Sequence, residues 1–144
     1  METIPSVLFA YINGLKSHDV PKIAVAVADD LRFITPAATA DKERFLSFLR
    51  ALYAAFPDWT YDPDEPELRA DQIAVKWRQG GTHTGTLCFP GIPAVAPTGK
   101  KVVIPAQFFF YRVRDDRIVE IRPEPIAGGA PQGILQQIGA EWPT

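Results

Sequence analysis

Apolar residues in the first 57 positions recur every three or four residues, which is the spacing of an amphipathic helix. Three segments show this spacing: Ile4, Val7, Leu8, Tyr11, Ile12 and Leu15; then Val20, Ile23, Ala24 and Val27; then Phe45, Phe48, Leu49, Leu52 and Phe56. Asp19 is placed to cap the second helix, and Thr39 or Asp41 to cap the third. Pro57 is expected to end the third helix, and Leu31-Arg32-Phe33-Ile34 predicts a short strand before that helix.

From residue 58 onward the period changes to two, which predicts β-strands. The first clear strand alternates Ile73, Val75 and Trp77 with Ala74, Lys76 and Arg78. The longest strand, 101–114, carries apolar residues on both faces: Val102, Ile104, Ala106, Phe108 and Phe110 on one, and Val103, Phe109, Tyr111 and Val113 on the other. Both faces of this strand must therefore be covered.

The remaining segments fit around these two strands. Asp115-Asp116 predicts a turn into a strand at 118–122, which completes an antiparallel hairpin. Prolines within 59–68 cannot donate to a sheet ladder, so this segment is predicted to be an edge strand at best. The tail holds a possible docking helix with Ile134, Leu135 and Ile138.

Helices followed by a run of strands predict an α+β fold, with helices on one face of an antiparallel sheet. Because the long strand is apolar on both faces, the sheet is expected to curl. Its concave side would enclose a pocket between the first and third helices, and its convex side would meet a second subunit. No linker divides the chain, so we expect a single domain over 1–144, with a core at about 3–126 and a tail at 127–144.

The composition of the chain argues against nucleic acid and membranes as partners. The 144 residues include 15 Lys+Arg and 17 Asp+Glu, a formal charge of −2, so no basic surface for nucleic acid is expected. The longest aliphatic stretch, 23–28, is far shorter than the ~18 apolar residues of a membrane helix, so no membrane partner is expected. A lone cysteine, Cys88, and an N-terminus unlike a secretory signal favour a cytoplasmic protein, although a cysteine-poor secreted domain would fit the thiol almost as well.

Several motifs follow one another in a recognisable order: Phe56-Pro57-Asp58-Trp59, Gly81-Thr82-His83-Thr84-Gly85, Pro97-Thr98-Gly99-Lys100, a hairpin at 108–120, and a tail at 133–139. Together they resemble the SnoaL-like polyketide cyclases of the nuclear-transport-factor-two-like superfamily, and the tail resembles the ester cyclase branch. The resemblance covers roughly residues 3 to 126.

This resemblance implies a cone-shaped α+β barrel with an apolar pocket, usually in a homodimer. It also implies general acid/base chemistry on an enolisable ketone or ester, so the expected partner is a small hydrophobic ligand and no metal or organic cofactor is expected. Related pockets host a ketosteroid isomerase and an epoxide hydrolase, so the fold alone does not select a reaction.

His83 is the first catalytic candidate, because an imidazole exchanges protons near neutral pH and His83 matches the motif histidine of the family. The alternative is a hydrogen-bonded structural histidine at a strand end. The chain has only two histidines, His18 and His83, and no HExxH motif or cysteine cluster, so no metal site is expected.

Glu124 is the second catalytic candidate. The family places its general acid/base aspartate on the last strand, but the matching position here is Pro123, which cannot move a proton. Glu124 could substitute if the proline redirects the strand and burial raises the pKa of the carboxyl group. The alternative is a solvated carboxylate at the end of a strand.

Candidate ligand-binding residues are large aromatic or polar side chains near these motifs: Trp77, Gln107, Tyr11, Tyr111, Phe109, Arg122 and Asp58. Each has a simpler explanation. The aromatic residues can be plain core, Gln107 can satisfy a backbone group or a dimer contact, Arg122 can pair with Glu120 or Glu124, and the Pro57-Asp58 pair can simply end a helix.

Two functional hypotheses follow. The first is a SnoaL-like cyclase or isomerase that moves a proton next to a carbonyl, with His83 as a polar participant. The second is a non-catalytic module of the same fold that binds a hydrophobic ligand or a partner subunit. Pro123 favours the second hypothesis, and the Gly-Thr-His-Thr-Gly motif favours the first.

Overall fold

The computed structural model describes residues 3–140 of the chain. In chain order, its elements are α1 (Ser6–Lys16), α2 (Val20–Ala26), β1 (Val27–Ile34), β2 (Thr39–Ala40), α3 (Lys42–Ala55), β3 (Thr60–Pro63), β4 (Glu67–Arg69), β5 (Gln72–Thr82), β6 (Lys101–Arg114), β7 (Arg117–Pro123) and α4 (Gln132–Gln137). None of these helices is long and apolar enough to cross a membrane.

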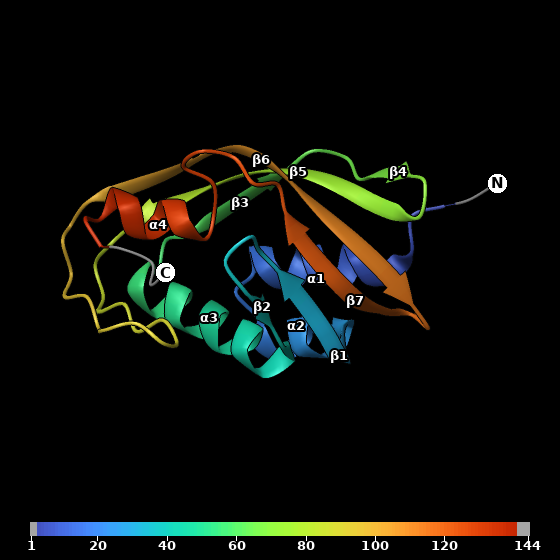
Figure 1. Cartoon of the computed structure of the whole chain (residues 1–144), viewed down its shortest axis with the longest axis horizontal. Helices are drawn as coiled ribbons and strands as arrows, with labels where there is room; N and C mark the ends of the chain where they lie inside the picture. Colours follow the sequence, from blue (N-terminus) through green and yellow to red (C-terminus); the bar gives the residue numbers. More distant parts are fainter. Residues whose placement is uncertain (1–2, 141–144) are drawn as a thin grey trace.

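The strands form one curved sheet in the order β2-β1-β7-β6-β5-β3, with β4 also paired to β5. Figure 1 shows α1, α2 and α3 together beneath one face of this sheet. The predicted α+β class, with helices packed on a curved antiparallel sheet, is therefore confirmed. The sheet does not close into a barrel, and the β1–β7 pair is parallel rather than antiparallel.

The aspartate caps predicted for α2 and α3 are present, whereas α1 begins after Pro5 and has no side-chain cap, so Thr3 is not the N-cap that the sequence suggests. The Asp19 carboxylate accepts a hydrogen bond from the backbone N–H of Lys22 at 3.1 Å, and the Asp41 carboxylate accepts one from Arg44 N–H at 2.9 Å. These bonds satisfy donors that the first turn of each helix leaves free.

The strand after α2 begins earlier than the sequence predicts. Helical spacing groups Val27 with α2, but α2 ends at Ala26 and Val27 already pairs with Ile118 of β7. A long-range pairing on the sheet thus overrides a local helical pattern, and β1 has eight residues instead of the four at 31–34.

A bulge in β6 changes which of its residues face the helices. Ile104 pairs with Gln79 and Gln107 pairs with Trp77, so Pro105 and Ala106 together stand opposite one residue of β5. Simple alternation would put Ile104 and Gln107 on opposite faces. The extra residue instead turns both toward the interior, where both are buried.

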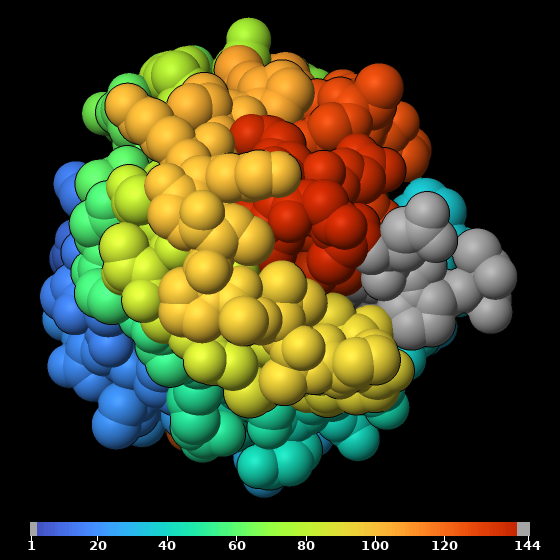
Figure 2. Space-filling model, turned by 90° about the vertical axis from the view of Figure 1, so that its left-hand side faces the viewer, coloured from blue at the N-terminus to red at the C-terminus, as the bar shows by residue number. Residues whose placement is uncertain are grey.

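The C-terminal tail is fastened to β6 by two glutamine side chains. Gln107, 1% exposed, accepts from Ala130 N–H at 2.9 Å and donates to the Glu124 carbonyl at 2.8 Å. Gln137 donates to the Val103 carbonyl at 2.8 Å and accepts from Val103 N–H at 2.9 Å. The tail helix α4 therefore closes one end of the molecule, and Figure 2 shows it beside the loop that precedes β6.

Candidate functional site

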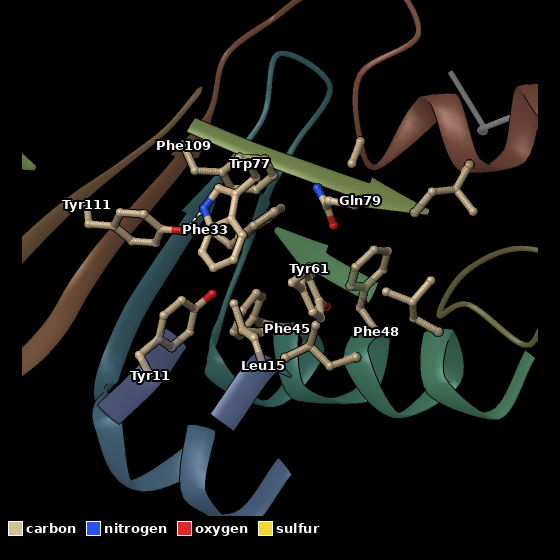
Figure 3. Close-up of a pocket in the computed structure, with 14 residues that line it drawn as sticks. Tyr11, Leu15, Phe33, Phe45, Phe48, Tyr61, Trp77, Gln79, Phe109 and Tyr111 are labelled. Carbon is tan, nitrogen blue, oxygen red and sulfur yellow. Dashed lines mark hydrogen bonds between the residues drawn. The ribbon is translucent and has the colours of Figure 1, made fainter. Parts of the chain in front are cut away.

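An inner cavity lies between α1, α3 and the concave face of the sheet (Figure 3). Its walls are almost entirely aromatic and aliphatic: Tyr11, Leu15, Phe33, Phe45, Phe48, Leu49, Leu52, Tyr61, Trp77, Gln79, Phe109, Tyr111, Ala130 and Ile134. The space open to the centre of a water-sized sphere is about 40 Å³. This volume admits a few waters or one end of a ligand, not a whole polycyclic molecule.

A wider mouth adjoins the inner cavity, with about 310 Å³ of space by the same measure. Phe33, Phe45 and Phe48 line both spaces, so the two spaces are neighbours and these rings stand between them. Phe33 stacks on Phe45 with ring centroids 5.1 Å apart. Phe33 and Phe48 are only half-buried, and Phe48 stacks on Phe89 with ring centroids 4.5 Å apart.

The inner cavity has one organised set of hydrogen-bond donors. The indole Nε1–H of Trp77 donates to the Tyr111 hydroxyl at 3.0 Å, and this bond is buried. Tyr11 packs edge-on against Tyr111, with ring centroids 5.6 Å apart, and the two hydroxyls interact. A contact between the two hydroxyls can use only one of their two hydrogens, so one O–H remains for a ligand acceptor.

Burial keeps these phenols protonated. Loss of solvent raises the pKa of Tyr11, Tyr61 and Tyr111 above the usual tyrosine range. At neutral pH each hydroxyl is therefore a neutral hydrogen-bond donor and not a base.

The other polar groups of the inner cavity are already engaged with protein partners. The Tyr61 hydroxyl lies 2.8 Å from the Tyr53 hydroxyl, and Gln79 Oε1 accepts from Trp59 Nε1–H at 3.3 Å. Within residues 3–140, no group of three or more His, Cys, Asp or Glu side chains is arranged to hold a metal ion.

The Gly-Thr-His-Thr-Gly motif lies against the end of α3, outside this cavity. The backbone N–H groups of Thr84 and Gly85 both donate to the Ala55 carbonyl, at 3.1 and 3.0 Å. A Cβ on Gly85 would stand 2.2 Å from the Ala54 carbonyl oxygen, so only glycine fits this approach. Asp58 accepts from Thr82 N–H at 2.7 Å, and this bond lowers the pKa of the Asp58 carboxyl group.

His83 is fully buried within this motif. Its Nδ1 accepts from the backbone N–H of Thr98 at 3.2 Å and lies 2.9 Å from the Thr98 hydroxyl. Its ring stacks on Phe56, and its Nε2 has no hydrogen-bond partner among the described residues. Burial lowers the pKa of the imidazole, and the nearby Gly85 backbone opposes that shift only in part.

Comparison with known proteins agrees with this arrangement of elements. The sequence model of the SnoaL-like domain matches residues 8–121. The chain belongs to the SnoaL-like domain family. No similar protein was found among curated sequences.

Solved structures share the SnoaL-like fold with this chain. A candidate SnoaL-like polyketide cyclase from Jannaschia sp. CCS1 has a TM-score of 0.71 at 17% identity, over 99% of this chain and 98% of that one. IdmH, a candidate polyketide cyclase from Streptomyces antibioticus, has a TM-score of 0.64 at 25% identity, over 83% and 88%. AclR, a candidate hydroxylase from Streptomyces galilaeus, has a TM-score of 0.67 at 19% identity, over 83% and 72%.

The structure brings four of the predicted ligand-binding residues together. Tyr11, Trp77, Phe109 and Tyr111 all line the inner cavity of this SnoaL-like domain. They come from three elements, α1, β5 and β6, and β5 and β6 are paired so that Val75 faces Phe109 and Ile73 faces Tyr111.

The other three predicted ligand-binding residues do not line the inner cavity. The amide group of Gln107 bonds to backbone groups of the tail. Arg122 is exposed and pairs with Glu120, whose Oε2 lies 3.1 Å from its Nε. Asp58 holds the end of β5 through Thr82.

The two predicted catalytic residues are likewise outside the walls of the inner cavity. Glu124 accepts from the backbone N–H of Phe108 at 3.2 Å, which replaces a sheet bond at the end of β7. His83 has the Thr98 contacts described above. Pro123 pairs with Phe109, so it stands on the concave face beside a residue of the cavity.

The sequence analysis missed several cavity residues. Phe33, Phe45 and Phe48 are apolar residues that its patterns could assign only to the core, and Gln79 continues the alternation of Ile73, Val75 and Trp77 by one more step. Tyr61 pairs with Gln79, so β3 contributes to the cavity. The prolines of this segment had predicted an edge strand at best.

The buried imidazole of His83 makes stability depend on pH. A lowered pKa in the folded state means that the unfolded state binds the proton more readily, so stability is complete above the ordinary histidine pKa of about 6.5 and falls as the pH drops below it. We expect the melting temperature of the wild type to fall more than that of His83→Gln between about pH 7.5 and about pH 5.5. An equal fall in melting temperature for the wild type and His83→Gln over this pH range would contradict this account of His83.

Proposed function

We propose that this SnoaL-like chain binds a small hydrophobic ketone or ester in the inner cavity and acts on it as a cyclase or isomerase, without a cofactor. The observation that carries the proposal is the buried hydrogen bond from Trp77 to Tyr111, with Tyr11 beside it, in an otherwise apolar cavity. A ligand carbonyl oxygen is the acceptor that completes this set of donors.

The proposed chemistry uses the phenols as a fixed electrostatic support. When a proton leaves the carbon next to a carbonyl, negative charge moves to the oxygen, and a neutral O–H donor stabilises that charge. Trp77 orients the Tyr111 hydroxyl before the ligand arrives, so little reorganisation is needed during the reaction. A ligand that fills the inner cavity would displace water from it, which strengthens each hydrogen bond there.

The candidate proton acceptors lie outside the walls of the inner cavity. The residues that line the inner cavity include no carboxylate and no imidazole. His83 and Glu124 stay the predicted acid/base groups, and a role for either in catalysis would need a water or a ligand group to reach it from the cavity.

A second candidate function is a non-catalytic binding module. Pro123 favours it, because a proline stands on the concave face beside Phe109 where the resemblance places the catalytic aspartate. The same cavity would then bind the carbonyl compound without changing it.

Deuterium exchange at the acidic C–H of 2-tetralone, followed by NMR, tests the proposal. The wild type should exchange this hydrogen faster than buffer, and Tyr11→Phe or Tyr111→Phe should lower the rate about 100-fold, the effect of removing one such donor. Tyr53→Phe is the matched control, because Tyr53 is a half-buried phenol that does not line the inner cavity. His83→Ala and Glu124→Gln should each lower the rate at least about 100-fold if they act as acid/base groups.

Three outcomes separate the hypotheses. Wild-type exchange no faster than buffer, over a panel of ketones and esters, would contradict the enzyme proposal. If Pro123→Asp then gained exchange, the binding module would be supported. An exchange rate that Tyr11→Phe and Tyr111→Phe leave unchanged would show that these two hydroxyls do not support the reaction.

We also propose that the chain forms a homodimer through the convex face of the sheet. Val103 on this face is 61% exposed, and Phe108 and Phe110 stack there with ring centroids 6.1 Å apart. The Arg69 guanidinium lies 4.6 Å from the Phe108 ring centroid and covers it only in part. An apolar centre with charged residues around it is typical of a protein interface.

Light scattering should give about twice the chain mass of 15.9 kDa at micromolar concentration. Phe110→Lys should give a monomer, because it would bury a charge in the interface. Phe9→Lys, at an exposed phenylalanine of α1, should leave the dimer intact. A stable wild-type monomer would contradict the proposal.

A further inference from the structure

We propose that Arg44 binds an anionic end of the ligand, so that the preferred ligand is an apolar carbonyl compound that ends in a carboxylate. This inference rests on the proposed function, because it concerns the outer part of the same site. It adds a charged recognition point to a cavity whose inner part is neutral.

Arg44 is the charged residue among those that line the mouth of the cavity. The others are small, apolar or hydroxyl-bearing: Phe33, Thr35, Ala38, Thr39, Ala40, Phe45, Phe48, Pro90, Gly91, Ile92 and Pro131. A ligand that lies in the mouth would therefore meet one positive charge and no negative one.

The Arg44 guanidinium has no acidic partner within residues 3–140, whereas neighbouring basic residues of α3 do. Lys42 pairs with Asp29 at 3.2 Å, and Arg50 lies 3.9 Å from Glu43. Asp41 and Glu43 are the acidic residues next in sequence to the mouth. Asp41 bonds to the backbone N–H of Arg44 and not to its side chain, and Glu43 lies near Arg50. The guanidinium donors of Arg44 therefore remain for a ligand.

The side chain of Arg44 ends close to a loop that also lines the mouth. A Cβ built on Gly91, in this loop, would stand 2.8 Å from Arg44 Nη2. Gly91 has a φ of +84°, a conformation that suits glycine, so the loop can approach the guanidinium closely. A guanidinium held over an opening can donate two parallel hydrogen bonds to a carboxylate.

The two parts of the site define the order of groups in the ligand. The inner cavity, about 40 Å³, accepts only the carbonyl end beside the tyrosines, while the mouth, about 310 Å³, accepts the apolar body. The three phenylalanines common to both spaces would pack against that body. A carboxylate beyond them would sit beside exposed Arg44 and keep most of its hydration, so its desolvation cost would be small.

Calorimetric titration with a matched pair of probes tests this inference: 6-acetyl-2-naphthoate and its methyl ester, which carry the ketone at one end of an apolar body and differ in the charge at the other end. At low ionic strength the wild type should bind the acid about threefold to tenfold more tightly than the ester, and added salt should reduce this preference. Arg44→Gln should bind both probes equally. Arg50→Gln, which removes a charge from the same helix outside the mouth, should keep the wild-type preference.

The outcomes distinguish this inference from the proposed function. Equal binding of acid and ester by the wild type, or a preference that survives Arg44→Gln, would overturn the role of Arg44. If the role of Arg44 were overturned but ketone exchange still depended on Tyr11, the proposed function would be kept and only this inference would fail. If the wild type bound neither probe and exchanged no ketone, both proposals would fail.

Discussion

One extra residue in β6 determines what faces the interior of this SnoaL-like domain. The bulge at Pro105 and Ala106 reverses the alternation of the strand, so Ile104 and Gln107 point to the same side. On one side of the bulge, Ile104 joins the core that covers α4. On the other side, Gln107 fastens the tail, and Phe109 and Tyr111 follow it into the inner cavity. Without the bulge, either the core or the cavity would lose its residues from β6.

Much of this fold follows from the sequence because local patterns and tertiary packing agree. The helical spacing predicts α1, α2 and α3, the capping aspartates Asp19 and Asp41 occupy their predicted positions, and alternation predicts β5, β6 and β7. Two predictions, the length of β1 and the faces of β6, were wrong because each depends on contacts between residues far apart in the sequence. β1 is extended by its parallel pairing with β7, and the faces of β6 are changed by a bulge that only Pro105 signals, since prolines in paired strands concentrate at bulges and edges.

The candidate site was only partly predictable for a similar reason. Aromatic residues at Tyr11, Trp77, Phe109 and Tyr111 could be proposed from size and polarity, but their convergence depends on the curvature of the sheet. For Gln107 the sequence left a ligand contact and a backbone contact open, and the structure shows the backbone contact, because its amide group bonds to the tail.

The motif that best matches the family has a clear structural explanation in this chain. Gly85 permits close contact with the end of α3, Asp58 holds the backbone of Thr82, and His83 packs on Phe56. These contacts join the loop before β6 to α3, and both of these segments contribute to the mouth of the cavity. A motif of this kind can identify a fold across a family while the reaction depends on other residues.

The central claim is that a ligand is bound by the aromatic cavity and not by the motif around His83. NMR titration with 2-tetralone tests it through two side-chain signals, the indole N–H of Trp77 and the imidazole C–H of His83, assigned with Trp77→Phe and His83→Gln. We predict that the Trp77 signal shifts and saturates while the His83 signal stays in place, because Trp77 donates to Tyr111 in the cavity wall and His83 is held by Thr98 outside it. A saturable shift of His83 with an unchanged Trp77 would contradict the account.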